Sequence, residues 1–304
     1  MTIIRAILIL LFLAAPAMAE EGRTTLGFGR IFSNDRIGDG GDRWRTGSWT
    51  VSAVSGYGWS GDGPGRFGDV VELRFRSEII APAALYGPGS DDRPYVGALT
   101  YGMHTHWALW GGEASAGIDV TWTGPQTGLA DLHDRIHERI SAPNLSDEVV
   151  AGQIGDGVHP SLTLEWGLPL RMGDRALLRP FVEMQTGVEE IARIGADVLI
   201  GRVGQRDLML RDAVTGHRYR ATRDDARGLA VVAGADWARV GDSLWLPEDR
   251  GFAARDERWR TRLGVIAQPF ERADVFLGVT WLSPEFVGQP EGQTLGSLVV
   301  RFRF

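Results

Sequence analysis

The sequence contains no cysteine and no lysine. Without cysteine the chain has no disulfide, no thiolate ligand for a metal and no cysteine nucleophile. Without lysine it has no Schiff-base residue, no Ser–Lys dyad and no P-loop, which requires a lysine on the phosphates. All 32 basic residues are therefore arginine, and the net charge is −7. A protein that binds nucleic acid through the phosphate backbone is normally basic, so we expect no nucleic-acid partner.

Long apolar runs are also scarce. The longest opens the chain, where Arg5 precedes the apolar residues 6–15 and a small-x-small cleavage pattern at residues 17–19. This order is that of a secretory signal peptide, so we expect residues 1–19 to be removed and residues 20–304 to form the mature domain. A membrane anchor is the alternative, but the run is too short to span a bilayer. No other stretch reaches 18 consecutive apolar residues, so no transmembrane helix is expected.

Period-two alternation of apolar and polar residues dominates the rest of the chain. About a dozen segments show it, separated by clusters of glycine, proline and aspartate, and the 41 glycines and 11 tryptophans fit short strands joined by tight turns. The apolar residues expected to share a face are Leu26, Phe28 and Phe32; Trp49, Val51, Ala53 and Tyr57; Leu162, Leu164, Trp166 and Leu168; Leu263, Val265 and Ala267; Val275, Leu277, Val279 and Trp281; and Leu298, Val300, Phe302 and Phe304.

The alternation fits two closed-sheet architectures. A soluble sandwich would bury the apolar faces, whereas a transmembrane barrel turns them toward lipid and lines its interior with polar groups. Three features favour the barrel: the expected export, charged residues deep within strands such as Glu72 and Arg74, and an aromatic residue that ends the chain. We therefore predict an all-β chain, a closed antiparallel 12-stranded barrel in the bacterial outer membrane, as a monomer. Arg301 and Arg303 should face inward, because a charge on the lipid face costs roughly 2–4 kcal/mol at mid-bilayer.

One segment departs from the strand rhythm. After Thr123-Gly124-Pro125, apolar residues recur every three or four positions, which predicts an amphipathic helix of about four turns. Thr127 is placed to cap its N-terminus. A simple barrel does not need a helix, so we expect this one to be a functional loop element at the rim. The apolar positions are Leu129, Leu132, Ile136 and Ile140.

Two histidines on this helix are candidates for chemistry. His133 and His137 lie four residues apart and could share a metal ion. The zinc-protease pattern is incomplete, because position 141 is serine, and no third ligand lies nearby in the sequence. A surface pair without a ligand is therefore the simpler expectation. The G-x-S-x-G elbow of serine hydrolases is absent.

A second candidate segment is rich in aspartate and glycine. Residues 33–43 hold Asn34, Asp35, Asp39 and Asp42 among glycines. Oxygen ligands on a flexible loop suit calcium, although the segment does not match the EF-hand pattern. An ordinary turn has a similar composition, so the residues alone leave both interpretations open.

Five motifs, taken in order along the chain, give these candidates a context. They are Ser33-Asn34-Asp35 with Asp42-Arg43-Trp44-Arg45-Thr46-Gly47; Asp91-Asp92-Arg93-Pro94-Tyr95-Val96-Gly97; Thr123-Gly124-Pro125 followed by His137 to Pro143; Ser283-Pro284-Glu285-Phe286-Val287-Gly288-Gln289; and Gly296-Ser297-Leu298 with Arg303-Phe304 at the end. Together they resemble the outer-membrane lipid A 3′-O-deacylase family (LpxR-like proteins). The D-R-P-Y-x-G element and the spacing from Pro125 to His137 are the most specific points of the resemblance.

The resemblance implies a concrete function. Members of this family are 12-stranded outer-membrane barrels that need calcium and hydrolyse the ester of the 3′-linked acyloxyacyl chain of lipid A, the anchor of lipopolysaccharide. By position, Asp35 is then the calcium ligand, and Asn34 and Thr46 belong with it to the catalytic set. His137 is the general base that activates water, a role that suits the pKa of histidine. Calcium and the Asn34 amide would stabilise the oxyanion of the intermediate.

The chain also departs from the family pattern. Ser33 stands at the motif's opening glutamate, and the lysine usual in the family's site has no counterpart here. Arginine can replace lysine as a charge but not as a proton donor. A non-enzymatic barrel therefore stays open as a second hypothesis, either a small-solute pore or a scaffold that binds lipid A without cleaving it. A lumen packed with side chains would argue against the pore.

Overall fold

The computed structural model describes residues 22–86, 92–270 and 273–302. The expected signal peptide and its cleavage site lie outside the described residues. Within these three ranges no helix is long and apolar enough to cross a membrane.

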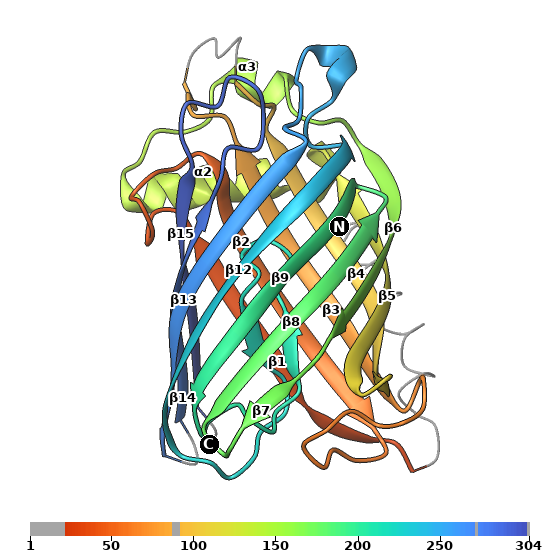
Figure 1. The fold of residues 1–304 in the computed structure, drawn as a ribbon. Coiled ribbons are helices and arrows are strands. Elements are labelled where there is room, and N and C mark those ends of the chain that lie inside the picture. The colour runs from red at the N-terminus through yellow and green to blue at the C-terminus, as the bar shows by residue number, and fades with distance from the viewer. Residues whose placement is uncertain (1–21, 87–91, 271–272, 303–304) are drawn as a thin grey trace.

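The described residues close into an antiparallel barrel with twelve wall strands (Figure 1), as predicted. Each wall strand pairs with the next along the chain, and the ring closes where the first strand pairs with the last. A closed ring satisfies every backbone group between neighbours, which lets strands cross lipid. The wall strands are β1 (Thr24–Asn34), β2 (Trp44–Gly56), β3 (Val70–Ala81), β4 (Val96–Leu109), β5 (Gly112–Thr123), β6 (Gly157–Gly167), β8 (Ala176–Thr186), β9 (Glu189–Gly201), β12 (Gly228–Ser243), β13 (Glu257–Phe270), β14 (Ala273–Leu282) and β15 (Gln293–Phe302).

The remaining elements extend, fill or cover this wall. Strand β7 pairs with the start of β8, and β10 and β11 form a separate hairpin. Helices α2 and α3 follow β5 and lie at one end of the barrel (Figure 1). Their bounds are β7 (Leu170–Met172), β10 (Met209–Arg211), β11 (Arg218–Arg220), α2 (Leu129–Ile140) and α3 (Asp147–Ala151), with single 3₁₀ turns η1 (Pro125–Thr127) and η2 (Glu248–Arg250).

The predicted strand faces hold along most of the wall. On β14, Leu277, Val279 and Trp281 are exposed, whereas Thr280 between them is buried. On β15, Val300 is exposed and Ser297 is buried, while the Arg301 guanidinium donates a hydrogen bond to the Arg220 carbonyl of the hairpin. This is the expected register, with apolar residues toward lipid and arginine inward. The side chains of Phe302, Arg303 and Phe304 lie outside the described residues.

One assignment of face is wrong. Leu26 was expected to share the outer face with Phe28 and Phe32, which are indeed exposed. The ladder to β2 shifts between Thr25 and Gly27, so Leu26 sits in a β-bulge. A bulge adds one unpaired residue and breaks the alternation. Leu26 packs instead against the buried side chains of the cluster that includes Val54.

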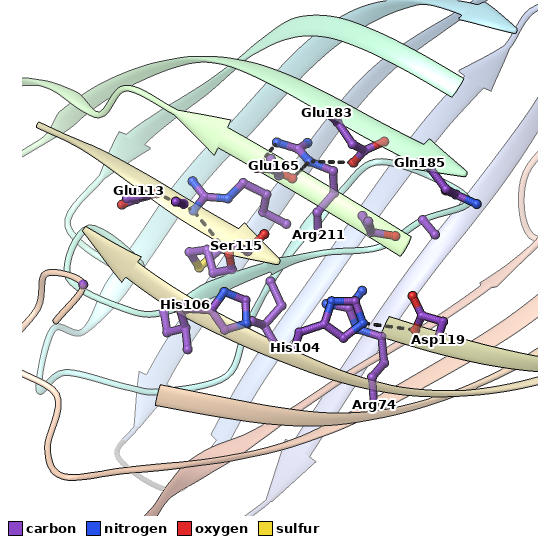
Figure 2. A pocket seen from close by; sticks show the side chains of 18 of the residues that line it. Arg74, His104, His106, Glu113, Ser115, Asp119, Glu165, Glu183, Gln185 and Arg211 are labelled. Carbon is purple, nitrogen blue, oxygen red and sulfur yellow. Dashed lines mark hydrogen bonds and ion pairs between the residues drawn. The ribbon is translucent and has the colours of Figure 1, made fainter. Parts of the chain in front are cut away.

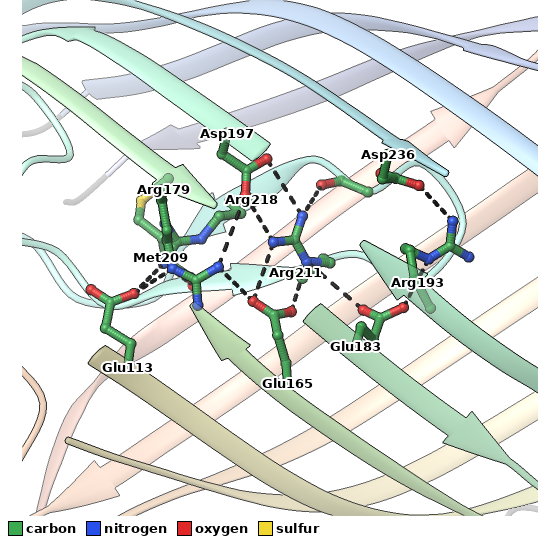
Figure 3. A network of polar contacts seen from close by, with 12 residues as sticks. Glu113, Glu165, Arg179, Glu183, Arg193, Asp197, Met209, Arg211, Arg218 and Asp236 are labelled. Atoms are coloured by element: carbon green, nitrogen blue, oxygen red, sulfur yellow. Dashed lines mark hydrogen bonds and ion pairs between the residues drawn. The ribbon is translucent and has the colours of Figure 1, made fainter. Parts of the chain in front are cut away.

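The lumen is filled by the β10–β11 hairpin. Leu210 and Tyr219 of the hairpin pack against inward-facing Ile31 of the wall. Arg211 donates hydrogen bonds to Glu165 at 2.7 Å and to Asp197 at 2.8 Å, two carboxylates from opposite sides of its guanidinium (Figure 3). Buried arginines and acids in such a network satisfy one another. The lumen is therefore packed with side chains, and this argues against a pore.

A polar cavity remains inside the lumen beside this hairpin. Figure 2 shows Arg74, His104, Asp119 and Glu165 among the side chains that line it. His104 is bonded to Asp119 at 3.0 Å, so the histidine already has its own carboxylate. The lining includes neither the two helix histidines nor the acidic loop between β1 and β2. The cavity is thus separate from the residues that the sequence singled out.

The strand register places those residues together at one rim. The end of β1 pairs with the start of β2, the start of β2 pairs with the end of β3, and β4 begins at the same end. Since β5 runs antiparallel to β4, its last residue, Thr123, also lies at this rim, and α2 follows directly. The hairpin enters from the opposite end, between β9 and β12.

Candidate functional site

A carboxylate and two histidines meet where the β1–β2 loop contacts α2. The Asp42 Oδ2 atom lies 2.8 Å from His137 Nε2, and Asp42 Oδ1 lies 3.4 Å from His133 Nε2. One ligand atom from each residue lies within 4.8 Å of the other two. Both histidines are buried, with 5% and 3% of their surfaces exposed. The prediction of a surface pair is therefore wrong, because both rings are buried, and Asp42 from a distant part of the chain lies beside them.

The helix aligns the two histidines because residues four apart share one face. It begins one residue later than predicted, after Gly128, which occupies the N-cap position in the left-handed conformation. The Thr127 hydroxyl donates to the Gly124 carbonyl at 2.8 Å and accepts from the Leu129 amide at 3.4 Å, so it bonds the first helical amide as predicted although Gly128 occupies the N-cap position. Gly97 of the D-R-P-Y-x-G element allows the close approach of the helix to β4. A Cβ atom at position 97 would lie 2.9 Å from Leu129 Cβ, closer than real Cβ atoms tolerate.

His137 is oriented by both of its ring nitrogens. Nδ1 is hydrogen-bonded to the Pro143 carbonyl, which can only accept, so Nδ1 carries a proton. Nε2 is then the atom that faces Asp42 and can accept a proton or bind a cation. A deprotonated Nε2 and a carboxylate oxygen 2.8 Å apart would repel each other, so this contact requires a proton or a cation.

Tyr95 completes the buried side of the cluster. Its ring stacks on His133 with the centroids 5.9 Å apart, and its surface is 1% exposed. Neither the Tyr95 hydroxyl nor His133 Nδ1 has a hydrogen-bond partner among the described residues. Burial, together with the charges of Asp134 and Asp42, raises the pKa of Tyr95. Unpartnered buried polar atoms are rare in native proteins and often mark a place for water or an ion.

Thr46 links the histidine cluster to Asp35. Its hydroxyl lies 2.9 Å from Asp35 Oδ1 and 2.9 Å from Asp42 Oδ1. A hydroxyl has one proton, so it can donate to only one of these carboxylates at a time. Two carboxylates thus lie close to one oxygen, an arrangement that a bound cation would stabilise.

The two carboxylates differ in their electrostatics. Burial raises the pKa of Asp35 to about 6, against the lowering by the hydrogen bonds from the Arg43 amide and Thr46. Burial also acts to raise the pKa of Asp42. Hydrogen bonds from His133 and Thr46 and the charges of both histidines outweigh it, and the pKa of Asp42 is lowered. Asp42 is therefore the carboxylate that stays ionised more easily.

The predicted first-strand residues are held mainly by their own loop. The Asn34 amide donates to the Thr46 carbonyl at 2.7 Å and accepts from the Arg36 amide at 2.8 Å. Asp35 Oδ2 accepts from the Arg43 amide at 2.8 Å and from Gln293 at 3.3 Å. Asp35 is therefore connected to His137 only through Thr46 and Asp42. This connection is less direct than the predicted site of Asn34, Asp35 and His137 implied.

The oxygen atoms around Thr46 are of the chemical types that calcium binds. Carboxylate and amide oxygens are the ligands that calcium prefers, and Asp35 and Asn34 supply them. Asp35 Oδ2 already accepts two hydrogen bonds, whereas Oδ1 accepts only the one from Thr46. A carboxylate oxygen has room for two partners, so Oδ1 is the Asp35 atom open to an ion.

A buried ion network supports this rim from below. Arg45 pairs with Glu78 at 2.6 Å, Glu189 at 3.1 Å and Glu285 at 2.9 Å. Arg93 of the D-R-P-Y-x-G element pairs with Glu285 as well. Arg93 therefore forms an inward ion pair at the start of β4. Three of the motifs therefore meet in one network, which holds the loop that carries Asp42.

Replacing Arg45 by alanine should lower the free energy of unfolding by about 3–5 kcal/mol, because three buried carboxylates lose their shared cation. Urea unfolding of the refolded protein in detergent micelles, followed by tryptophan fluorescence, measures this. Arg239→Ala is the matched control, since Arg239 pairs with Asp256 at the surface. Such surface pairs contribute less than about 1 kcal/mol. Equal stability of the two variants would contradict a structural role for the network.

Sequence reasoning named Asp42 and His133 as separate metal-ligand candidates, but it missed that they meet and that Tyr95 lies against them. Each lies inside a quoted motif or on the predicted helix, so the residues were visible in the sequence. Their meeting was not visible, because Asp42 and His137 are far apart along the chain and only the register of β1 to β5 brings them to one rim.

Comparison with known proteins shows that the fold is similar to that of a solved structure. No family model matches the sequence, and no curated protein matches it. Among solved structures, LpxR from Salmonella typhimurium matches with a TM-score of 0.75 at 16% identity, covering 91% of this chain and 100% of that chain. The β domain of the Bordetella autotransporter BrkA (TM-score 0.46, 12% identity, 93% and 100% covered) and the KdgM porin (0.41, 6%, 91% and 98%) are more distant. This chain is a bacterial outer-membrane β-barrel with the fold of LpxR.

Proposed function

We propose that this protein is a calcium-dependent lipid A 3′-O-deacylase, a carboxylic ester hydrolase of the outer leaflet. The proposal depends on the position of His137, which is buried at the rim with Nδ1 held by the Pro143 carbonyl and Nε2 directed at Asp42. The Thr46 hydroxyl links the Asp42 carboxylate to that of Asp35. This histidine lies at the position where the sequence motifs resemble the deacylase family. The fold that this chain shares with LpxR supports the same proposed function.

The helix that carries His137 presents an apolar face away from the protein. Leu132, Ile136 and Ile140 are 45%, 44% and 47% exposed, while the histidine face is buried. A rim helix with an exposed apolar face next to the lipid-facing wall is placed to contact acyl chains. This favours a lipid as the substrate, presented to the site from the side of the membrane.

The chemistry follows from the groups at the site. In the form that acts as a base, His137 Nε2 is unprotonated and a water molecule lies between it and Asp42. Nε2 takes a proton from this water, whose oxygen attacks the ester carbonyl carbon. The protonated ring is held by the Pro143 carbonyl and stabilised by Asp42. It then returns the proton to the sugar oxygen as the carbon–oxygen bond breaks, giving a free fatty acid and a hydroxyl group. A calcium ion at Asp35, when bound, would supply positive charge to the oxyanion of the intermediate.

Mass spectrometry of lipid A tests the proposal. Cells that express the protein should contain lipid A that lacks the 3′-linked acyloxyacyl chain, and cells without it should retain that chain. Unchanged lipid A, with the barrel present in the outer membrane and calcium supplied, would contradict the enzyme and favour the non-catalytic scaffold. The side chains that fill the lumen argue against a small-solute pore.

Replacing Ile136 by aspartate should lower hydrolysis of lipid A in membranes by about tenfold or more, because a charge on the lipid-facing side of α2 weakens its contact with acyl chains. Ile136 does not face the histidine cluster, so hydrolysis of a short-chain ester in solution should change little. The ratio of the two rates, measured on purified protein, separates lipid contact from chemistry. Equal losses on both substrates would contradict a lipid-contacting role for this face.

A further inference from the structure

We propose that Asp42, His133 and His137 form a binding site for a divalent transition metal of the zinc class, separate from the oxygen atoms of Asp35. Zinc sites use nitrogen and oxygen ligands about 2.0–2.2 Å from the ion, which places neighbouring ligand atoms about 3.3 Å apart in a tetrahedron. Asp42 approaches both histidines near this spacing, His137 with Oδ2 at 2.8 Å and His133 with Oδ1 at 3.4 Å. With one ligand atom taken from each residue, the three atoms lie within 4.8 Å of one another. The three groups therefore face one small space, and an ion there would draw them closer together.

The ligand types select the metal. Two imidazoles and one carboxylate form a borderline-soft set that suits zinc, cobalt, nickel or copper. Calcium binds six to eight oxygens and has little affinity for imidazole nitrogen. His133 and His137 are spaced four apart on one helix face, as paired zinc ligands on helices often are. Three protein ligands also leave a fourth position for water, as in catalytic zinc sites.

The surroundings provide a second, independent observation. The Tyr95 hydroxyl is buried without a partner, and the Tyr95 ring stacks directly on His133. A water molecule in the fourth position of a bound metal would give this hydroxyl a partner. The His137 ring is already fixed through Nδ1 by the Pro143 carbonyl, a support that metal-binding histidines commonly have.

The local charge also favours a cation. The Thr46 hydroxyl lies 2.9 Å from both Asp42 and Asp35, so a second carboxylate lies next to the ligand set. The nearby Arg43 side chain is turned to Glu291 and Asp39 instead. Among the described contacts of the three ligands, no arginine neutralises Asp42.

Occupancy would have a consequence for the proposed function. A metal on His137 Nε2 uses the lone pair that would accept the proton of water, so the metal-bound form cannot use His137 as a base. Zinc should therefore inhibit the hydrolysis reversibly. This consequence rests on the proposed deacylase activity, whereas metal binding itself does not.

Cobalt titration of the full-length protein in detergent micelles tests the site. After treatment with a chelator, Co²⁺ should bind with one equivalent per chain and give the visible absorption of a four-coordinate site. Zinc should displace it, and excess calcium should not. His133→Gln and Asp42→Asn should weaken cobalt binding by more than about 100-fold, beyond the ~10–100-fold of an outer-shell change.

Two matched variants serve as controls. His106 pairs with Glu72 at 2.8 Å in the barrel wall, and Asp39 belongs to the same loop as Asp42 without touching the histidines. His106→Gln and Asp39→Asn should bind cobalt as wild type does. The heat-modifiable electrophoretic mobility of barrels reports whether each variant is folded. A colourless wild type, or a folded His133→Gln variant with unchanged affinity, would overturn the site.

The activity arm distinguishes this site from the proposed function. Zinc should inhibit wild-type hydrolysis of lipid A, and the concentration required should rise by about 100-fold in His133→Gln, measured against that variant's own metal-free rate. Cobalt binding without any hydrolysis would support the site and contradict the deacylase. Hydrolysis that zinc leaves unchanged or stimulates, with cobalt bound, would overturn the inhibitory consequence.

Discussion

Replacing His137 by alanine should lower the rate of lipid A hydrolysis by about 10²–10⁴-fold, the usual contribution of a positioned general base. The ring is the group at this rim whose Nε2 can take a proton from water while its other nitrogen is held by the Pro143 carbonyl. Folding should be retained, because α2 lies outside the strand ladder that closes the barrel. Mass spectrometry of lipid A, from membranes with equal barrel abundance, measures the effect.

His133→Ala is the natural control for this variant. It removes a buried histidine from the same helix face, one turn earlier, and leaves the His137–Asp42 contact in place. Under calcium-sufficient conditions without zinc, it should reduce activity much less than His137→Ala. Equal activity of His137→Ala and wild type would disprove the assignment of the base. A large loss with His133→Ala alone would move the base one turn along the helix.

The sequence predicts the barrel well because the signal is local and repeated. Each wall strand alternates lipid-facing and inward residues, so Leu277 and Val279 reveal their face without any knowledge of their neighbours. The exception at Leu26 arises from a bulge, and alternation contains no sign of the extra residue. The helix was predicted for the same local reason. Its start was wrong by one residue because a left-handed glycine, and not Thr127, ends the preceding turn.

The hairpin that fills the barrel could not be predicted from the alternation of residues. Strands β10 and β11 are three residues each, too short to show a period, and they are held by buried arginines such as Arg211 rather than by apolar alternation. The site has the same limitation. Asp42 and the two histidines meet through pairings of distant strands, so a search for a third ligand near His137 in the sequence had to fail.

Removing calcium should abolish hydrolysis if the ion is held at Asp35. Without the ion, the oxyanion of the intermediate would lose its main source of positive charge at this rim, because the chain has no lysine and Arg43 pairs with Glu291. A calcium-selective chelator should therefore stop the reaction, and added calcium should restore it. A zinc-selective chelator should not stop it, since zinc at the histidine cluster is inhibitory in this scheme.

The substitution Asp35→Asn tests the calcium requirement at a single residue. The amide keeps an oxygen at the position of the carboxylate but removes the negative charge that calcium prefers, so the calcium concentration for half-maximal activity should rise sharply, by about tenfold or more. Asp39→Asn is the matched control, because Asp39 lies in the same loop and bonds only to backbone amides of Gly41 and Thr294 in addition to its contact with Arg43. Its calcium requirement should stay near that of wild type. Full activity in excess calcium chelator would exclude the calcium mechanism. Any metal that the reaction then needs would have to bind at Asp42, His133 and His137, the one group of three such ligands among the described residues.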